Sequence, residues 1–335
     1  MKKQKLISAS VCVLMLCGIK LSAQDTFSIV AADSTTREVG TAGASCVDLY
    51  TTSFTDDGFL GDPIPNKGVI NTQAAYLAAN QTNARARMNA GDTPAQIITW
   101  LTANDAQANS STRQYGIVGF TGNNVNAMGF TGANCTSYKN HVTGKVGPFC
   151  YSVQGNILLG QKVIDSIEAR FRREPGDLTC KLMAALQGGK MVGADTRCAP
   201  NNSSTLFAFI KVAKPTDVYG SPSFTVSVRT HNNAMIEPID SLQKKFNKIY
   251  SCTSPTGIKD NSVENYFTIY PNPANDLITI NGNYFNSAEI YSVLGTIVYK
   301  GNSRVIDVSK FSKGLYLIYV TDQKGKKYYS KFLRE

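Results

Sequence analysis

The sequence predicts an α+β protein in which a medium-sized domain of strands and helices is followed by a small all-β sandwich. In the first part, strand-like segments stand in runs that suit antiparallel pairing, and helical patterns come between them. In the last part, 266–335, short alternating segments are separated by turn residues. A chain of 335 residues is long enough for both parts.

The chain opens with the pattern of a secretory signal peptide, which we assign to residues 1–23. Lysines precede an apolar run at 6–16, and small residues follow up to Ala23. The run is too short for a spanning helix, which needs about 20 apolar residues. Leu16 is bulky where a lipoprotein signal has a small residue before its cysteine, so a lipid anchor is disfavoured. Later segments are less apolar, and we expect no transmembrane helix in the mature chain.

The elements of the first part follow in order along the chain. Alternation at 27–31 and a small-residue run at 39–47 indicate a β-hairpin. Thr93 can cap a helix, Pro94 suits its first turn, and Gln96 completes a capping box. Further strands are expected at 69–76, 115–120, 127–130, 206–212 and 224–228, and further helices around 163–171, 178–186 and 239–249.

Composition and spacing exclude several classes of function. The formal net charge is +10, but the excess of lysine and arginine lies in the signal peptide and in 266–335. The charge therefore does not indicate a nucleic-acid site, and no nucleic acid is expected as a partner. The two histidines, His141 and His231, lie far apart, and no HExxH or CxxC spacing is present. We therefore expect neither a metal nor another cofactor.

Six cysteines follow the signal peptide, an even number that suggests disulfides in an exported protein. Nearest-neighbour pairing would join Cys135 to Cys150 and Cys180 to Cys198, although six cysteines allow many other connectivities. Cys46 can be a nucleophile or a buried or bridged residue. The oxidising route of export favours the second.

Four motifs in the first part resemble one bacterial family. They are TFSIVAADSTTREVGTAGASCV from Thr26, NTQAAY at 71–76, YSVQGNILLGQKVIDSI from Tyr151 and GADTR at 193–197. They resemble the domain-of-unknown-function family whose members typically open Met-Thr-Phe-Ser-Ile-Val-Ala and which is grouped with the N-terminal-nucleophile (Ntn) hydrolases. The likeness runs from about 26 to 246. It implies a four-layer αββα Ntn-hydrolase-like sandwich and an amide-hydrolase activity.

The resemblance places Thr26 at the nucleophile position of an Ntn hydrolase. There the first residue of the processed chain supplies the attacking hydroxyl, and its free α-amine is the base. An α-amine has a pKa of about 7.7–8.0, so part of it is neutral near pH 7. Cleavage after Ala23 leaves Gln24 and Asp25 ahead of Thr26. Thr26 is therefore catalytic only after further trimming, and is otherwise a strand residue beside a vestigial pocket.

Four more residues are candidates for binding the substrate. Gln154 and Asn156 lie just before a predicted helix and are uncharged donors for an amide or an oxyanion. The alternative is a strand-to-helix turn held by side-chain bonds. Asp195 and Arg197 can form a charge pair in the pocket or a surface bridge. The chain departs from the family at Cys198, where the family has glycine, and at 229–233, which reads RTHNN without carboxylates.

The last part carries the motifs of an export signal. YPNPA at 270–274, the later IYSVLG and DVSKFSKGLYLI, and the basic ending KKYYSKFLRE resemble type A sorting domains of the type IX (Por) secretion system. The resemblance implies a small Ig-like sandwich, whose seven short strands the alternation also indicates. It names the type IX secretion machinery as a partner and implies delivery through the periplasm to the cell surface or the medium.

These observations predict a signal peptide at 1–23, an Ntn-hydrolase-like domain at 24–249, a linker at 250–265 and a sorting domain at 266–335. One hypothesis is an exported Ntn-type hydrolase that acts on an amide bond of an unknown small-molecule or peptide substrate. The other is a non-catalytic Ntn-fold binding module displayed at the cell surface. The mature N-terminus separates the two, because only a chain that begins at Thr26 has the required amine.

Overall fold

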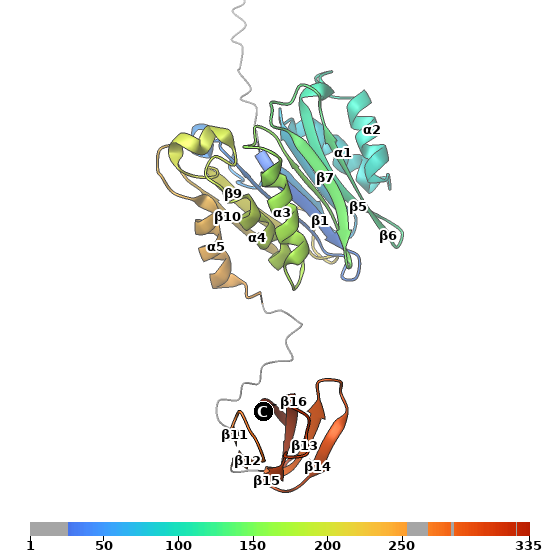
Figure 1. The fold of residues 1–335 in the computed structure, drawn as a ribbon. Helices are drawn as coiled ribbons and strands as arrows, with labels where there is room; N and C mark the ends of the chain where they lie inside the picture. Colours follow the sequence, from blue (N-terminus) through green and yellow to red (C-terminus); the bar gives the residue numbers. More distant parts are fainter. Residues whose placement is uncertain (1–25, 253–266, 283–284, 326) are drawn as a thin grey trace, which may run out of the picture. The chain divides into compact units, whose positions relative to one another are not determined.

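The computed structural model describes residues 26–252, 267–282, 285–325 and 327–335 (Figure 1). The chain divides into two compact units, Met1–Ser254 and Pro255–Glu335. The predicted signal peptide, 1–23, lies outside the described residues, as does most of the predicted linker.

The first unit contains a six-stranded antiparallel sheet with the strand order β10-β9-β2-β1-β8-β7. β1 and β2 form the predicted hairpin. The side chains of β1 alternate between two cores. Phe27 packs beneath the helices, and Val30, on the other face, packs against a second sheet. The strands are β1 Thr26–Asp33, β2 Val39–Ser45, β7 Asn140–Val146, β8 Phe149–Gly155, β9 Phe207–Ala213 and β10 Phe224–Arg229.

A four-stranded antiparallel sheet with the order β3-β4-β5-β6 packs on the six-stranded sheet. Valines from both sheets, among them Val30, Val39, Val69 and Val118, form the core between them. The strands are β3 Gly61–Ile64, β4 Gly68–Ala74, β5 Arg113–Thr121 and β6 Asn124–Thr131.

Helices cover the outer face of each sheet, which completes the four-layer αββα sandwich (Figure 1). Helices α3, α4 and α5 cover the six-stranded sheet, and α1 and α2 cover the other. The apolar face of each helix is thereby buried against a sheet. The helices are α1 Ala78–Asn89, α2 Pro94–Ala103, α3 Gln161–Arg173, α4 Leu178–Gly189 and α5 Pro238–Ile249, with short 3-10 turns η1 Leu49–Thr51, η2 Ser110–Thr112 and η3 Thr196–Asn201.

The sequence pattern predicted neither α1 nor β7, and the burial of their residues explains why. The capping box of Thr93 and Gln96 at the start of α2 is confirmed. In α1, by contrast, only Asn80, Ala84 and Met88 are buried, so its apolar stripe is too narrow to show a helical period. Every residue of β7 is at least partly exposed, and it therefore lacks the alternation that marks a half-buried strand.

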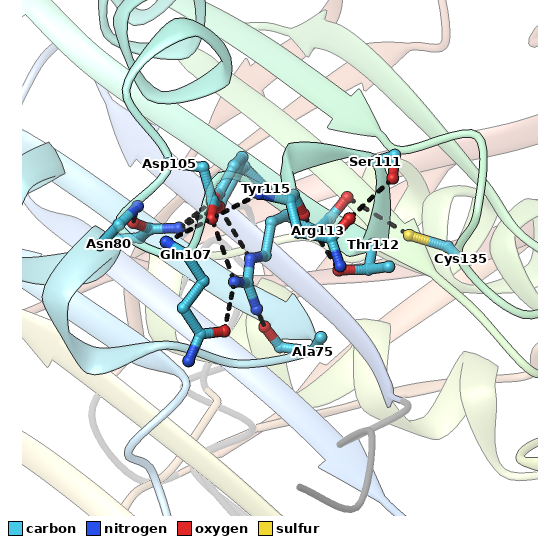
Figure 2. Close-up of polar contacts among 11 residues, drawn as sticks. Ala75, Asn80, Asp105, Gln107, Ser111, Thr112, Arg113, Tyr115 and Cys135 are labelled. Atoms are coloured by element: carbon cyan, nitrogen blue, oxygen red, sulfur yellow. Dashed lines mark hydrogen bonds and ion pairs between the residues drawn. The ribbon is translucent and has the colours of Figure 1, made fainter.

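A buried ion pair fastens the segment between α2 and β5 to the sheet (Figure 2). Arg113 Nε lies 2.8 Å from Asp105 Oδ2, and both side chains are almost wholly buried. The Asn80 side chain donates to the same carboxylate at 2.6 Å. Burial raises the pKa of Asp105, but the bonds from Arg113, from two backbone N–H groups and from Asn80 outweigh burial and lower that pKa below its ordinary value. The carboxylate is therefore charged at neutral pH.

The disulfides differ from the nearest-neighbour pairing. Cys46 pairs with Cys198 and Cys180 with Cys252, with Cα atoms 5.7 and 5.6 Å apart, and Cys135 and Cys150 are buried thiols. The predicted pairs Cys135–Cys150 and Cys180–Cys198 are thus wrong. The fold decides which Cα atoms come within reach of a disulfide, and spacing along the chain does not. Cys46 is bridged, as the export route favours.

The second unit is a small sandwich built, within its described residues, from seven short strands. Alternate residues of both sheets meet in one core, for example Ile278, Ile290, Ile318 and Phe332. One sheet is β11 Thr268–Tyr270, β12 Leu277–Asn281 and β15 Val305–Asp307; the other is β14 Ile297–Gly301, β13 Phe285–Ser292, β16 Gly314–Asp322 and β17 Lys327–Arg334.

Candidate functional site

Thr26 lies at one end of the six-stranded sheet, where β1 begins and β2 ends. Antiparallel pairing places it opposite Ser45, the last residue of β2. Both residues are wholly buried. Since side chains alternate along a strand, Thr26 shares its face with Val30, which points into the core between the two sheets. The hydroxyl-bearing side chain of Thr26 is therefore on the inner face of the sandwich.

Asn156 holds Thr26 by two hydrogen bonds. Its backbone N–H donates to the Thr26 carbonyl at 3.1 Å, and its side-chain Oδ1 accepts from the Thr26 nitrogen, also at 3.1 Å. The contact follows from the sheet, because β8 pairs with β1 and brings Gly155 opposite Phe27. Asn156 is the next residue after β8 and is wholly buried. It thus fixes the position of the Thr26 nitrogen.

Asp195 and Arg197 form an ion pair beside the end of β2. Arg197 donates from Nε to Oδ1 at 3.0 Å and from Nη2 to Oδ2 at 2.6 Å, a two-point geometry. The carboxylate of Asp195 is wholly buried, while 31% of the Arg197 side chain is exposed. Asp195 also accepts the Cys46 N–H at 2.9 Å, and Arg197 Nη2 lies 3.5 Å from Ser45 Oγ. The pair therefore borders the residue that lies opposite Thr26.

Gln154 lies deeper in the same interior. β8 pairs it with Ser28, which follows Thr26 by two positions on β1, so Gln154 shares the inner face of the sheet. Its Nε2 donates to Ser28 Oγ at 2.7 Å, and its Oε1 accepts from Ser152 Oγ at 2.9 Å. The side chain is wholly buried between the sheets. Its predicted role in substrate binding stays a prediction.

Two glutamines of the four-stranded sheet extend this polar interior. Gln73 on β4 donates from Nε2 to the Thr26 carbonyl at 3.1 Å and to Gln114 Oε1 at 2.7 Å. Its Oε1 accepts from Ser28 Oγ at 2.5 Å. Gln114 on β5 donates to the Gly155 carbonyl at 2.9 Å. Sequence reasoning missed both glutamines. Gln73 occurs within the motif NTQAAY, where a polar residue on a buried strand was the available signal.

His141 lies at the far end of the same network. Its Nδ1 is 2.9 Å from Thr131 Oγ1, which also accepts from Gln114 Nε2 at 2.9 Å. Burial lowers the pKa of His141, so the imidazole is mainly neutral at pH 7. Within the described residues, no group of three or more His, Cys, Asp or Glu side chains is arranged to hold a metal ion.

The structure brings four of the five predicted site residues to one end of the domain: Thr26, Asn156, Asp195 and Arg197. The model of a family of unknown function, DUF1028, matches residues 26–237. The chain belongs to the DUF1028 family. The part of this DUF1028 protein that the family model matches thus begins at Thr26 and includes all five predicted residues.

A crystal structure of a DUF1028 protein from Silicibacter pomeroyi has the same fold. It aligns with a TM-score of 0.52 at 22% sequence identity, over 68% of this chain and 90% of the other. None of the curated proteins matches the chain.

Residues 268–334 match the secretion system C-terminal sorting domain. This domain directs the protein across the outer membrane to the cell surface or the extracellular space, and it implies an interaction with the type IX secretion system. Among the helices that the structure describes, none is long and apolar enough to cross a membrane.

Proposed function

We propose that the DUF1028 domain is an N-terminal-nucleophile hydrolase that cleaves an amide bond, with Thr26 as nucleophile and base. The observation that carries the proposal is the fixed position of the Thr26 nitrogen, which donates to Asn156 Oδ1 at 3.1 Å. An amine at this position would be oriented by the same oxygen. The adjacent ion pair of Asp195 and Arg197 supports the assignment, since charged groups for a substrate are then close to the nucleophile.

The chemistry needs no group outside the chain and its substrate. The neutral α-amine of Thr26 takes the proton of its own hydroxyl, and Oγ attacks the substrate carbonyl carbon. The amine proton then passes to the leaving nitrogen, and the C–N bond breaks to give an ester on Thr26. Water, activated by the same amine, hydrolyses the ester and regenerates the hydroxyl. We assign stabilisation of the developing oxyanion to the amide group of Asn156.

Arg197 suggests the substrate class. A partly exposed guanidinium beside the site suits a carboxylate, with which it can form a charge-assisted hydrogen bond. We therefore propose N-acylated amino acids and short peptides as substrates, with Arg197 at the carboxylate and Asp195 holding Arg197 in place. Gln154 would act from the interior by supporting Ser28 on the strand that carries Thr26.

The test compares chains that differ only at the N-terminus. A chain beginning at Thr26 is made by site-specific protease cleavage, together with a chain beginning at Gln24. Both are screened against acylated amino acids and short peptides, and both are treated with an N-acyl amino β-lactone, which acylates an activated hydroxyl. We expect hydrolysis of the substrates and acylation of Thr26 only in the chain that begins at Thr26. In the chain that begins at Gln24, the Thr26 nitrogen is part of a peptide bond and cannot act as the base.

Two substitutions complete the test. Thr26→Ala in the trimmed chain should abolish both reactions, and Thr26→Ser should keep part of each, because the hydroxyl and the amine survive. Equal hydrolysis by the trimmed, extended and Thr26→Ala chains would place the nucleophile elsewhere. Absence of both reactions in every form, with a secreted chain that starts at Gln24, would support the binding module displayed at the cell surface.

A further inference from the structure

The disulfide between Cys46 and Cys198 joins two segments that meet beside Thr26. Cys46 directly follows Ser45, which lies opposite Thr26, and Cys198 directly follows Arg197. The two cysteines are 152 residues apart in the sequence. One covalent bond therefore connects the strand next to the proposed nucleophile with the turn that carries the charge pair.

Asp195 makes a noncovalent contact across the same junction. It accepts the Cys46 N–H at 2.9 Å while both of its oxygens are held by Arg197. Because Asp195 is wholly buried, losing these hydrogen-bond partners would cost stability. Without the bond, no covalent link holds η3 beside the end of β2, and the contacts of Asp195 must hold the junction alone. The two segments are then free to separate, which lengthens the Asp195 contacts.

We infer that the Cys46–Cys198 bond is a positioning element that holds Arg197 against the Thr26 site, so that the site becomes fully competent only after the bond forms. The inference rests on the proposed function of Thr26. Neither cysteine touches the reacting atoms, and their effect passes through Asp195 and Arg197.

Bond formation couples the site to export. It removes two electrons and two protons from the two thiols, and a disulfide-bearing exchange protein of the export route accepts them by becoming a dithiol. In a reducing cytoplasm the pair stays as thiols. At that stage the amine of Thr26 is also still part of a peptide bond. The site requires both formation of the disulfide and release of the Thr26 amine, and both changes then follow export.

The second disulfide is a matched control. It joins Cys180, near the start of α4, to Cys252, beyond the end of α5. The other end of α4 lies near the start of β1, where Gly189 lies against the Phe27 ring. Loss of the Cys180–Cys252 bond therefore removes the same kind of bond and leaves the contacts of Asp195 untouched.

The experiment uses the chain from Thr26 to Glu335 as wild type, as Cys46→Ser/Cys198→Ser and as Cys180→Ser/Cys252→Ser. Peptide mapping without reductant first verifies the bonds. The rate at which each form hydrolyses an N-acylated amino acid, whose carboxylate Arg197 is proposed to bind, is then measured. We expect the Cys46→Ser/Cys198→Ser variant to hydrolyse it about tenfold to a hundredfold more slowly, because a small misplacement near a reacting group costs that much. The Cys180→Ser/Cys252→Ser variant should keep the wild-type rate. Should the serine variant not fold, Cys46→Ala with Cys198→Gly replaces it.

Hydrogen exchange at the amide of position 46 gives a readout independent of catalysis. It should become faster in the first variant only, because that amide loses its bond to Asp195. Equal hydrolysis rates in the two variants would overturn the inference. If the wild type neither hydrolyses an acylated amino acid nor reacts with an N-acyl amino β-lactone, the proposed function fails. In that case faster exchange confined to the first variant still supports the positioning role, and unchanged exchange overturns it.

Discussion

Gln154 on β8 packs directly against the backbone of Gly116 on β5, so the two sheets meet there without a second side chain between them. A Cβ atom on Gly116 would lie 2.0 Å from Gln154 Oε1 and 2.4 Å from its Cδ. The Gln154 side chain cannot turn away freely, because its Nε2 donates to Ser28 and its Oε1 accepts from Ser152. The contact thus ties the packing of the sandwich to the polar interior beneath Thr26.

The first prediction follows from this contact. Gly116→Ala should lower the free energy of unfolding by about 1–3 kcal/mol, the usual cost of overpacking. Gly119→Ala is the matched control on the same strand, since a Cβ there would meet Pro94 only at 3.4 Å. Chemical denaturation of both variants measures the difference. Equal midpoints would show that Gln154 adapts at no cost.

A second prediction separates the two candidates on either side of Gly155. Gln154→Ala removes the buried acceptor of Ser152 and a buried donor to Ser28, and should destabilise the domain by about 1–3 kcal/mol. Asn156→Ala removes the acceptor of the Thr26 nitrogen and the amide donor assigned to the oxyanion, and it should slow β-lactone acylation of the trimmed chain far more than Gln154→Ala. Thermal melts and intact-mass kinetics provide the two readouts. Equal acylation by the Asn156→Ala and Gln154→Ala variants would remove Asn156 from the site.

The third prediction concerns Asp105 and pH. Because the pKa of Asp105 is lowered in the folded state, this group stabilises the fold above the ordinary carboxyl pKa of about 3.9. The contribution is lost as the pH falls from that value through the depressed pKa of the folded state. Over this range the carboxyl is already protonated in the unfolded state, whereas the folded state takes up its proton only at lower pH. Asp105→Asn should cost about 3 kcal/mol at pH 7, with a smaller difference from wild type in acid.

The control for Asp105 is a surface pair of the same chemistry. Lys190 Nζ lies 2.9 Å from Asp240 Oδ1, and both side chains are well exposed. Asp240→Asn should therefore cost at most about 1 kcal/mol. Urea denaturation at several pH values compares the two variants. A loss for Asp105→Asn no larger than that for Asp240→Asn would show that the buried pair has no special weight.

The fourth prediction tests the division of the chain. Deleting 266–335 should leave the remaining domain folded and hold it in the periplasm, because the two units have separate cores and the sorting domain directs outer-membrane passage. Cell fractionation locates the truncated protein, and its thermal unfolding reports on the fold. Normal surface delivery, or loss of the folded state, would contradict the prediction.

The sequence was informative where a local pattern has a local cause. Thr93 and Gln96 form their capping box within one turn. The alternation at 27–31 and the small-residue run at 39–47 indicate a hairpin whose strands are neighbours. The motifs from Thr26 and from Tyr151 also indicated the family and the αββα layers. By contrast, the polar α1 and the largely exposed β7 carried no such pattern, since few of their residues are buried.

The sequence by itself determined the C-terminal sorting domain, the fold class and four residues that meet at one end of the domain. Only the tertiary structure decided that Cys46 pairs with Cys198, that Gln154 lies between the sheets, and that Gln73 from the opposite sheet reaches the Thr26 carbonyl. These contacts join residues far apart in the chain. Their partners depend on strand order and sheet packing, which no periodicity within a single segment records.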